Sequence, residues 1–347
     1  MAQEPKRYQT DDFDYEYPQE AIAQRPLADR SASQLLVLDR QSGQIDHTTF
    51  RSFADLTDPG DVLVINVSRV VPARLTGRRE NGRDAEILLV HPEEDGCWIC
   101  LAHPGGKLKV GRKVFFGTDT TAEITGVLGG GLRRIRFSGV LDPAELMERF
   151  GAVPLPPYIT RPPESSDTDR YQTVYATEDG SVAAPTAGLH FTHDTLSRLR
   201  ERGVELAEVV LHVGPGTFKP VRDDDPSQHK MHAEWYSVSR RTADVVNAAK
   251  ADGRRVWAIG TTSARVLESV GSGGELREES GWTELFILPP YEFKIVDAML
   301  TNFHLPRSTL LMLVAAFSGH ELTMNAYREA VGRGYRLYSY GDAMAII

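Results

Sequence analysis

Residues 254–269 read RRVWAIGTTSARVLES and hold a strand, a turn and a helix in one continuous stretch. The apolar run before Gly260 is typical of a buried strand, and the residues from Ser263 onward have the spacing of a helix. Strands that lead directly into helices build α/β proteins, whose ligands bind at the carboxyl ends of the strands. The stretch therefore predicts an α/β fold with a binding site beside Gly260.

Similar strand and helix patterns lie on both sides of this unit. We expect helices at 19–24, 193–202, 241–252, 263–270, 308–317 and 324–332, and strands at 35–39, 45–50, 62–66, 206–212, 255–259, 285–288 and 335–340. The order of these elements favours a largely parallel α/β sheet.

The pattern changes after Pro72. Six short alternating runs follow, each bounded by glycine, proline or acidic residues, and no helix is expected before residues 142–150. Such a series predicts a small antiparallel β-barrel inserted into the α/β domain. Residues 1–70 and 152–347 would then form a discontinuous α/β domain, and residues 71–151 the barrel domain.

Charge is distributed unevenly along the chain. The whole sequence has a net charge of −9, whereas residues 69–136 carry twelve Lys and Arg against eight Asp and Glu. This asymmetry can mark a local nucleic-acid contact on an acidic protein, although charges on solvated strand faces give the same composition.

Nothing in the sequence indicates a membrane protein. The amino-terminal residues are polar and acidic, without the basic and apolar regions of a secretory signal. The longest apolar run, residues 310–317, is much shorter than the roughly 20 residues that span a bilayer. We therefore expect a cytoplasmic protein without a membrane partner.

The turn after the strand at 255–259 is a candidate anion site. Gly260, Thr261, Thr262 and Ser263 would place backbone N–H groups, hydroxyls and the positive end of a helix dipole at one point. A plain turn glycine followed by a helix cap is the alternative. Arg265 favours the anion, because a cation is unfavourable in the first turn of a helix unless an anion shares the site.

Several histidines stand in loops or at the ends of predicted strands. His190, His212, His232 and His304 occur in GLHF, LHVG, KMHAE and NFHLP. Their number indicates a shared site for acid–base chemistry, whereas a single one would more often be structural. A metal site built from His229, His232 and Glu234 is the alternative, but a second His-rich motif is absent, so no metal is expected.

The longer motifs resemble the S-adenosylmethionine:tRNA ribosyltransferase-isomerase family of queuosine biosynthesis. The likeness spans nearly the whole chain and lies in FDYEYPQEAIAQRPLADRSASQLLVLDR, VSRVVPARL, PLPPYI, DRYQTVYA, SVAAPTAGLHFT, LHVGPGTFKPV, HKMHAEWY, AIGTTSARVLES, LTNFHLPRSTLLML and YRLYSYGDAM. Val67, Ala264, Val266 and Pro290 depart from the residues usual in the family.

The resemblance implies a fold and a reaction. The implied fold is an α/β domain with an inserted β-barrel. The implied reaction transfers and isomerises the ribosyl group of S-adenosylmethionine, the co-substrate, onto 7-aminomethyl-7-deazaguanine at the wobble position of tRNA. Epoxyqueuosine, adenine and methionine are the products, and no metal takes part. The sequence leaves a monomer and a homodimer equally open.

This chemistry requires a base, an acid for the leaving groups and a clamp for the methionine carboxylate. We expect the base to be His190 or His212, with His232 or His304 assisting the leaving groups. The residues expected to bind S-adenosylmethionine are Gly188, Gly260, Thr261, Thr262, Ser263, Arg265 and Asn302. Those expected to bind tRNA phosphates are Arg69, Arg78, Arg79, Arg133, Arg134 and Arg136.

Two other functions compete with this hypothesis. A methyltransferase would use the same co-substrate, but it requires a glycine loop that leads into a helix, and Gly214 and Gly216 are followed by Thr-Phe-Lys-Pro. A non-catalytic RNA-binding module predicts a basic surface with many aromatic residues and has no need for histidine-bearing loops.

Overall fold

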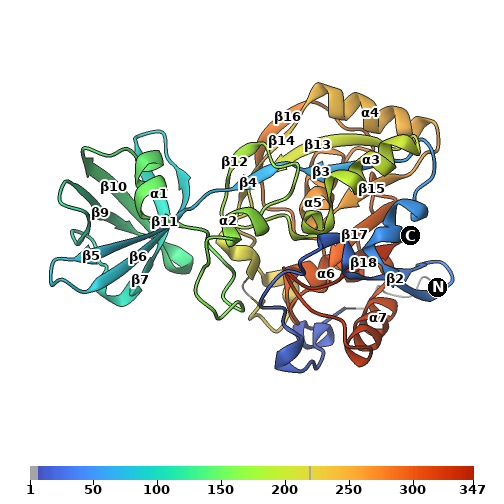
Figure 1. The fold of residues 1–347 in the computed structure, drawn as a ribbon, viewed down its shortest axis with the longest axis horizontal. Helices are drawn as coiled ribbons and strands as arrows, with labels where there is room; N and C mark the ends of the chain where they lie inside the picture. Colours follow the sequence, from blue (N-terminus) through green and yellow to red (C-terminus); the bar gives the residue numbers. More distant parts are fainter. Residues whose placement is uncertain (1–6, 219) are drawn as a thin grey trace.

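The computed structural model describes residues 7–218 and 220–347. Figure 1 shows an antiparallel barrel on one side and a large sheet flanked by helices on the other, with a narrow connection between them. The predicted fold class, an α/β sheet with an inserted antiparallel barrel, is confirmed.

The large sheet has nine strands. Their order is β16 (Glu279–Thr283), β14 (Glu234–Val238), β13 (Glu205–Leu211), β3 (Val62–Asn66), β15 (Val256–Ile259), β17 (Ala298–Asn302), β18 (Ala343–Ile346), β1 (Gln34–Leu38) and β2 (Ile45–Thr49). The four central strands from β13 to β17 are parallel, as is the β18–β1 pair, and the other neighbours are antiparallel. The sheet is therefore mixed, and its parallel part lies at the centre.

Helices cover both faces of this sheet. Alternate strand residues face opposite sides, so Val62 and Val64 of β3 pack in one core whereas Leu63 and Ile65 pack in the other. The first core includes residues of α4 (Arg240–Ala251), α5 (Thr261–Val270), α6 (Thr309–Ser318) and α7 (His320–Gly332). The second includes residues of α3 (His193–Glu201). The sheet is buried on both sides, which explains its nearly continuous apolar strands.

The barrel is a second, seven-stranded sheet. Its order is β11 (Gly151–Ala152), β5 (Arg74–Arg79), β6 (Asp84–Pro92), β7 (Cys97–His103), β10 (Leu132–Gly139), β9 (Thr120–Val127) and β8 (Lys113–Phe116). An additional β5–β8 pairing closes it. Helix α1 (Pro143–Phe150) packs Leu146 into the barrel core, so the barrel has a hydrophobic centre of its own.

A short ribbon joins the two bodies. Strand β4 (Ser68–Val70) leaves the large sheet directly after β3 and pairs in parallel with β12 (Glu178–Ser181). The short helix α2 (Asp167–Arg170) lies in the segment that returns from the barrel. Strand β4 leads the chain out toward the barrel, and the segment that holds α2 brings it back before β12 pairs beside β4 (Figure 1).

Three predicted elements differ from the structure. Residues 335–340 form no strand, because Tyr338 has a left-handed φ of 70° that an extended strand does not allow, and the last strand is β18 instead. Residues 285–288 also form no strand, since two prolines without N–H groups follow at once, and β16 and β17 flank them. The helix predicted at 19–24 is a single turn at Gln19–Ala21.

Two helices begin earlier than predicted. Helix α5 starts at Thr261, directly after Gly260, and α7 starts at His320. No helix in the described part of the chain is long and apolar enough to cross a membrane.

Candidate functional site

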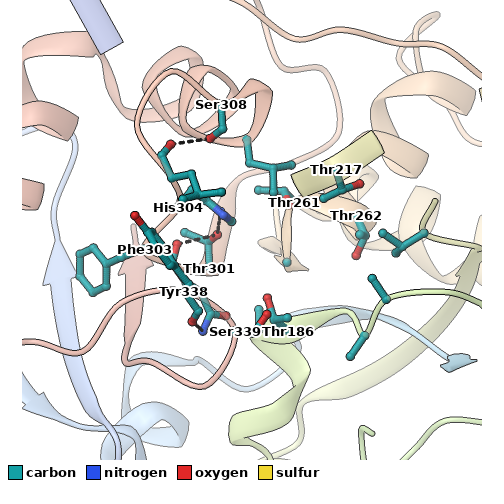
Figure 2. A pocket seen from close by; sticks show the side chains of 18 of the residues that line it. Thr186, Thr217, Thr261, Thr262, Thr301, Phe303, His304, Ser308, Tyr338 and Ser339 are labelled. Atoms are coloured by element: carbon teal, nitrogen blue, oxygen red, sulfur yellow. Dashed lines mark hydrogen bonds between the residues drawn. The ribbon is translucent and has the colours of Figure 1, made fainter. Parts of the chain in front are cut away.

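A pocket with about 620 Å³ of empty space, part of which is open solvent, lies at the carboxyl ends of β15 and β17 (Figure 2). Six segments of the chain meet there, around Tyr158, Ala184, Thr217, Thr261, Phe303 and Ser339. Among the described residues that line this pocket, which we call the central pocket, none is an aspartate, glutamate, lysine or arginine. It is a neutral cavity built of small residues, hydroxyls and aromatic rings.

The amino end of α5 opens into the central pocket. Gly260 caps this helix with a left-handed φ of 89°, a conformation that glycine adopts without strain. Thr261 and Thr262 line the pocket, and the buried Oγ1 of Thr262 has no hydrogen-bond partner among the described residues. The backbone N–H groups in the first turn of a helix have no partner within the helix, and together with the Thr262 hydroxyl they suit an anionic ligand group.

Ser263 and Arg265, the other two residues of the predicted anion site, do not line the pocket. Ser263 donates a hydrogen bond of 2.9 Å to the carbonyl oxygen of Ile259, the last residue of β15. The guanidinium of Arg265 binds the Glu234 carboxylate through Nη1 and donates to the carbonyl oxygen of Leu285 through Nε at 3.2 Å. The buried carboxylate of Glu234, rather than a bound ligand, therefore balances the charge of Arg265 in the first turns of α5.

The Arg265–Glu234 pair supports a turn that borders the pocket. Glu234 Oε1 accepts a hydrogen bond of 2.8 Å from the backbone N–H of Gly214 and one of 3.3 Å from the Thr217 hydroxyl. Thr217 lines the pocket. Arg265 thus contributes to the site as a positioning residue.

Asn302 reaches the central pocket from the end of β17. Its Nδ2 donates to the carbonyl oxygen of Tyr338 at 3.1 Å and to Nε2 of His190 at 3.2 Å. These two bonds fix the amide orientation, and the buried Oδ1 has no partner among the described residues. Asn302 therefore presents a fixed hydrogen-bond acceptor beside the pocket.

His190 lies behind Asn302 and does not line the central pocket. Its Nε2 accepts from Asn302, so Nδ1–H donates to the hydroxyl of Ser33 at 2.8 Å. Burial, reinforced by the charge of Arg336, lowers the pKa of His190 to about 3. The histidine is neutral at physiological pH, and both ring nitrogens are engaged, Nε2 with Asn302 and Nδ1 with Ser33.

His304 is the one of the four candidate histidines that lines the central pocket. The Thr301 hydroxyl donates to the Asn302 carbonyl oxygen at 3.3 Å, so it accepts from Nε2–H of His304 at 2.7 Å (Figure 2). Nδ1 therefore carries the lone pair. Burial lowers its pKa to about 3, so the ring is neutral at physiological pH and Nδ1 keeps its lone pair.

His212 and His232 lie elsewhere. His212 lines a second pocket between the barrel and the large sheet, where its ring stacks on Trp235 at a centroid distance of 5.1 Å. His232 is exposed and lies between Gly216 and the barrel glycine Gly130. The structure thus places the four histidines in four different environments.

Position 188 requires a glycine because the neighbouring side chains leave no room for a Cβ atom. A Cβ atom at this position would lie 2.1 Å from the Tyr175 hydroxyl and 2.7 Å from Cγ2 of Thr173. The glycine therefore lets the loop that carries His190 pack against Tyr175, and it does not line the pocket itself.

Most of the predicted phosphate-binding arginines have partners within the protein. Arg133 donates to the carbonyl oxygens of Gly105, Leu108, Gly131 and Leu132. Arg134 binds Glu93 and Asp95, and Arg136 binds Asp95 at 3.3 Å. Arg69 donates to the carbonyl oxygen of Ala176.

Arg78 and Arg79 line a pocket on the barrel. The side chain of Arg78 is 75% exposed and lies 4.0 Å from Asp84. It is more accessible than the side chain of Arg136, which is 56% exposed.

The sequence did not single out Tyr158 and Tyr338, whose rings form one wall of the pocket. Their centroids are 4.9 Å apart, and the left-handed backbone of Tyr338 directs its carbonyl oxygen to Asn302. The run of aromatic residues in YRLYSY was the available signal, but we interpreted it as a strand.

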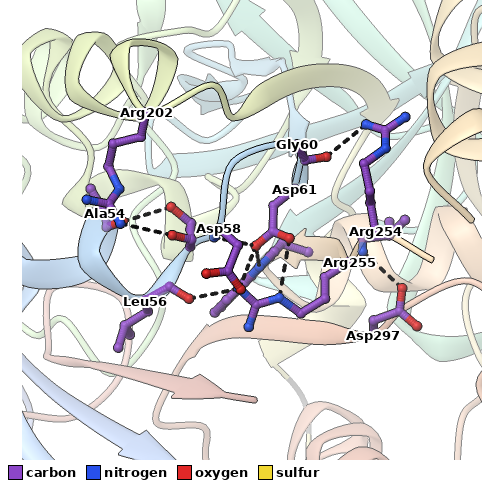
Figure 3. Close-up of polar contacts among 12 residues, drawn as sticks. Ala54, Leu56, Asp58, Gly60, Asp61, Arg202, Arg254, Arg255 and Asp297 are labelled. Carbon is purple, nitrogen blue, oxygen red and sulfur yellow. Dashed lines mark hydrogen bonds and ion pairs between the residues drawn. The ribbon is translucent and has the colours of Figure 1, made fainter. Parts of the chain in front are cut away.

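A cluster of charges at the amino ends of β3 and β15 is structural (Figure 3). Asp61 Oδ2 accepts hydrogen bonds from the backbone N–H of Asp58 at 3.0 Å, from Arg255 at 2.7 Å and from the indole of Trp257 at 3.0 Å. These bonds satisfy the carboxylate internally. Within residues 7–218 and 220–347, no three His, Cys, Asp or Glu side chains gather in a way that would hold a metal ion.

The chain is similar to proteins of queuosine biosynthesis. The family model described as queuosine biosynthesis protein matches residues 10–346. Two proteins named S-adenosylmethionine:tRNA ribosyltransferase-isomerase, from Symbiobacterium thermophilum and Thermotoga petrophila, are 51% and 50% identical, and each alignment covers 97% of this chain and 99% of the relative.

A solved structure agrees with these relatives. The crystal structure of S-adenosylmethionine tRNA ribosyltransferase from Thermotoga maritima matches with a TM-score of 0.57 and 40% identity. The match covers 97% of this chain and all of that one.

Proposed function

The chain belongs to the queuosine biosynthesis protein family, and on that premise we propose that it is an S-adenosylmethionine:tRNA ribosyltransferase-isomerase. Its RNA substrate is tRNA with 7-aminomethyl-7-deazaguanine at the wobble position, and its products are epoxyqueuosine in tRNA, adenine and methionine. The reaction takes place in the cytoplasm.

The lining of the central pocket offers groups that suit the co-substrate, and this is the observation that supports the proposal. The amino end of α5 supplies N–H groups for the methionine carboxylate. The rings of Tyr158 and Tyr338 offer π faces to a sulfonium cation without a competing charge. The unpaired Oδ1 of Asn302 and Oγ1 of Thr262 remain for the polar groups of the nucleoside.

Bound S-adenosylmethionine supplies the ribosyl group and a sulfonium that acidifies the neighbouring C5′ hydrogens. Among the candidate histidines, His304 is the one that offers a lone pair in the central pocket, so we assign it the role of base, with Nδ1 accepting the proton. Thr301 holds the opposite nitrogen and thereby fixes the ring orientation.

Asn302 binds substrate in this proposal, and His190 positions it through Nε2. The helix start at Gly260 and Thr261 holds the carboxylate in place. Residues 1–70 and 152–347 form the catalytic domain, and the barrel domain of residues 71–151 contributes contacts to the tRNA backbone.

The proposal is tested by product analysis. Purified protein with S-adenosylmethionine and tRNA carrying the aminomethyl base should release adenine and methionine, and neither should appear when that tRNA is omitted. Release of S-adenosylhomocysteine instead would identify a methyltransferase and overturn the proposal.

The assignment of His304 is tested in the same assay. His304→Gln should slow adenine release by roughly 100-fold or more, the usual contribution of a general base, while the affinity for S-adenosylmethionine stays nearly unchanged. His193→Gln, an exposed histidine at the start of α3, is the matched control. Adenine release by His304→Gln at the wild-type rate would refute the assignment.

A further inference from the structure

A second pocket lies between the barrel and the large sheet, with about 1190 Å³ of empty space that opens to solvent. We call it the interdomain pocket. The large sheet contributes His212, Trp235 and Trp282 to its lining, and the barrel contributes His91 and Trp98. Three of the four tryptophans of the chain therefore gather around one opening.

The two sheet tryptophans form one aromatic surface. Trp235 of β14 is directly paired with Trp282 of the antiparallel strand β16, so both side chains project from the same face of the sheet. Trp282 is 53% exposed, an unusual state for the largest apolar side chain. Its ring packs against that of His91 from the barrel, at a centroid distance of 5.1 Å and an interplanar angle of 63°.

The floor of this surface is rigid. The His212 ring stacks on Trp235 with an interplanar angle of 20°, and its Nδ1 lies 2.8 Å from the hydroxyl of Ser68. The backbone of Gly180 covers the ring so closely that a Cβ atom there would lie 2.6 Å from it. His212 is thus held in place to support Trp235.

Exposed, preorganised aromatic rings between two bodies are typical of sites that bind unstacked nucleobases. Enzymes that act on a base commonly take it out of its stack into such a pocket. The interdomain pocket also adjoins the central pocket, because Val213 lines both. A base held here would stand next to a nucleoside held there.

We propose that the interdomain pocket receives the wobble base of tRNA, which stacks on Trp282 and Trp235 with its aminomethyl group directed past Val213 toward the central pocket. This inference rests on the function proposed above and names the place where the second substrate binds.

The charges at the pocket suit this base. Two carboxylates line it, and Glu234 is committed to Arg265 and to the N–H of Gly214. Asp179 lies 3.5 Å from Arg69, and its side chain is 66% exposed. Because of this exposure, its carboxylate is accessible to the ammonium group of the incoming aminomethyl substituent.

The test is a double-mutant cycle that combines a substitution in the protein with removal of the wobble base from the RNA. Two fluorescein-labelled anticodon stem-loop RNAs are compared by anisotropy, one with the aminomethyl base at the wobble position and one abasic there. For the wild-type chain, loss of the base should weaken binding about 10-fold, the usual contribution of base–aromatic stacking. Trp282→Ala should weaken binding of the intact RNA about 10-fold as well, yet bind the abasic RNA as the wild type does.

Three variants serve as controls. Trp282→Phe keeps a ring and should retain most of the affinity. His91→Ala removes the ring that contacts Trp282 across the opening but keeps both tryptophans. It should leave the coupling between Trp282 and the wobble base unchanged. Val140→Ala alters an exposed apolar residue on the barrel, outside the pocket, and should bind both RNAs as the wild type does.

The outcomes separate the two proposals. Suppose that the wild-type chain releases adenine. If Trp282→Ala then binds the intact RNA as tightly as the wild type, or if the losses of affinity from Trp282→Ala and from removal of the base are additive, the pocket assignment is wrong and the proposed function stands. If the cycle shows coupling but no adenine is released, the pocket binds the base and the proposed reaction is wrong.

Discussion

Acidification should destabilise the folded chain through His304. The side chain is 9% exposed, and burial lowers its pKa from the ordinary 6.5 to about 3. Between these values the unfolded chain binds a proton at this histidine and the folded chain does not. Stability is therefore lost as the pH falls below 6.5, and the loss continues until about pH 3.

The size of the effect follows from the two pKa values. At pH 5 the unfolded state gains about 2 kcal/mol by protonating one such histidine. His190 is equally buried and has the same pKa of about 3, so it adds a similar amount. Together the two histidines should lower the free energy of unfolding by about 4 kcal/mol between pH 7 and pH 5.

Urea unfolding, followed by tryptophan fluorescence at pH 7 and pH 5, measures this loss. The decisive quantity is the difference between proteins: His304→Gln should lose about 2 kcal/mol less than the wild type over the same interval. This comparison removes the contributions of His212 and His229, whose pKa values are also lowered by burial. The exposed His193→Gln control should lose as much as the wild type. Equal losses in wild type and His304→Gln would refute the reasoning.

Three further predictions concern the supports of the site and its RNA contacts. Arg265→Met should lower the free energy of unfolding by about 3–5 kcal/mol in urea titrations, because Glu234 is left buried without a counter-charge, and adding Glu234→Gln should restore part of it. Gly188→Ala should reduce the yield of folded protein and its melting temperature, since the new Cβ would lie 2.1 Å from a tyrosine hydroxyl; a wild-type melting temperature would contradict this. Charge reversal of Arg78 and Arg136 should weaken tRNA binding in filter assays and reduce its salt dependence by about one unit per lost phosphate contact, and unchanged binding would exclude them from the interface.

The fold was predictable where local pattern and tertiary structure agree. The strand β15, the turn at Gly260 and the helix α5 are all visible in a single stretch, and the alternating runs after Pro72 do form a barrel. The errors occur where an individual backbone conformation decides. Tyr338 looks like part of a strand, but its left-handed φ turns the chain and carries it along the pocket instead.

The site was harder to predict because its parts come from distant segments. A histidine in a loop has no local signal that says which cavity it faces, so the sequence could not distinguish His304, which lines the central pocket, from His190, which lies behind Asn302. Arg265 was similarly ambiguous, because its partner Glu234 is 31 residues away and belongs to another strand.

The central claim is that this chain transfers the ribosyl group of S-adenosylmethionine to tRNA. It is tested most directly by two parallel incubations with tRNA carrying the aminomethyl base, one with label in the ribose and one with label in the methyl group. The account predicts that ribose label enters the tRNA and that methyl label is recovered only in free methionine. Methyl label in the tRNA, with the ribose label left in S-adenosylhomocysteine, would contradict it.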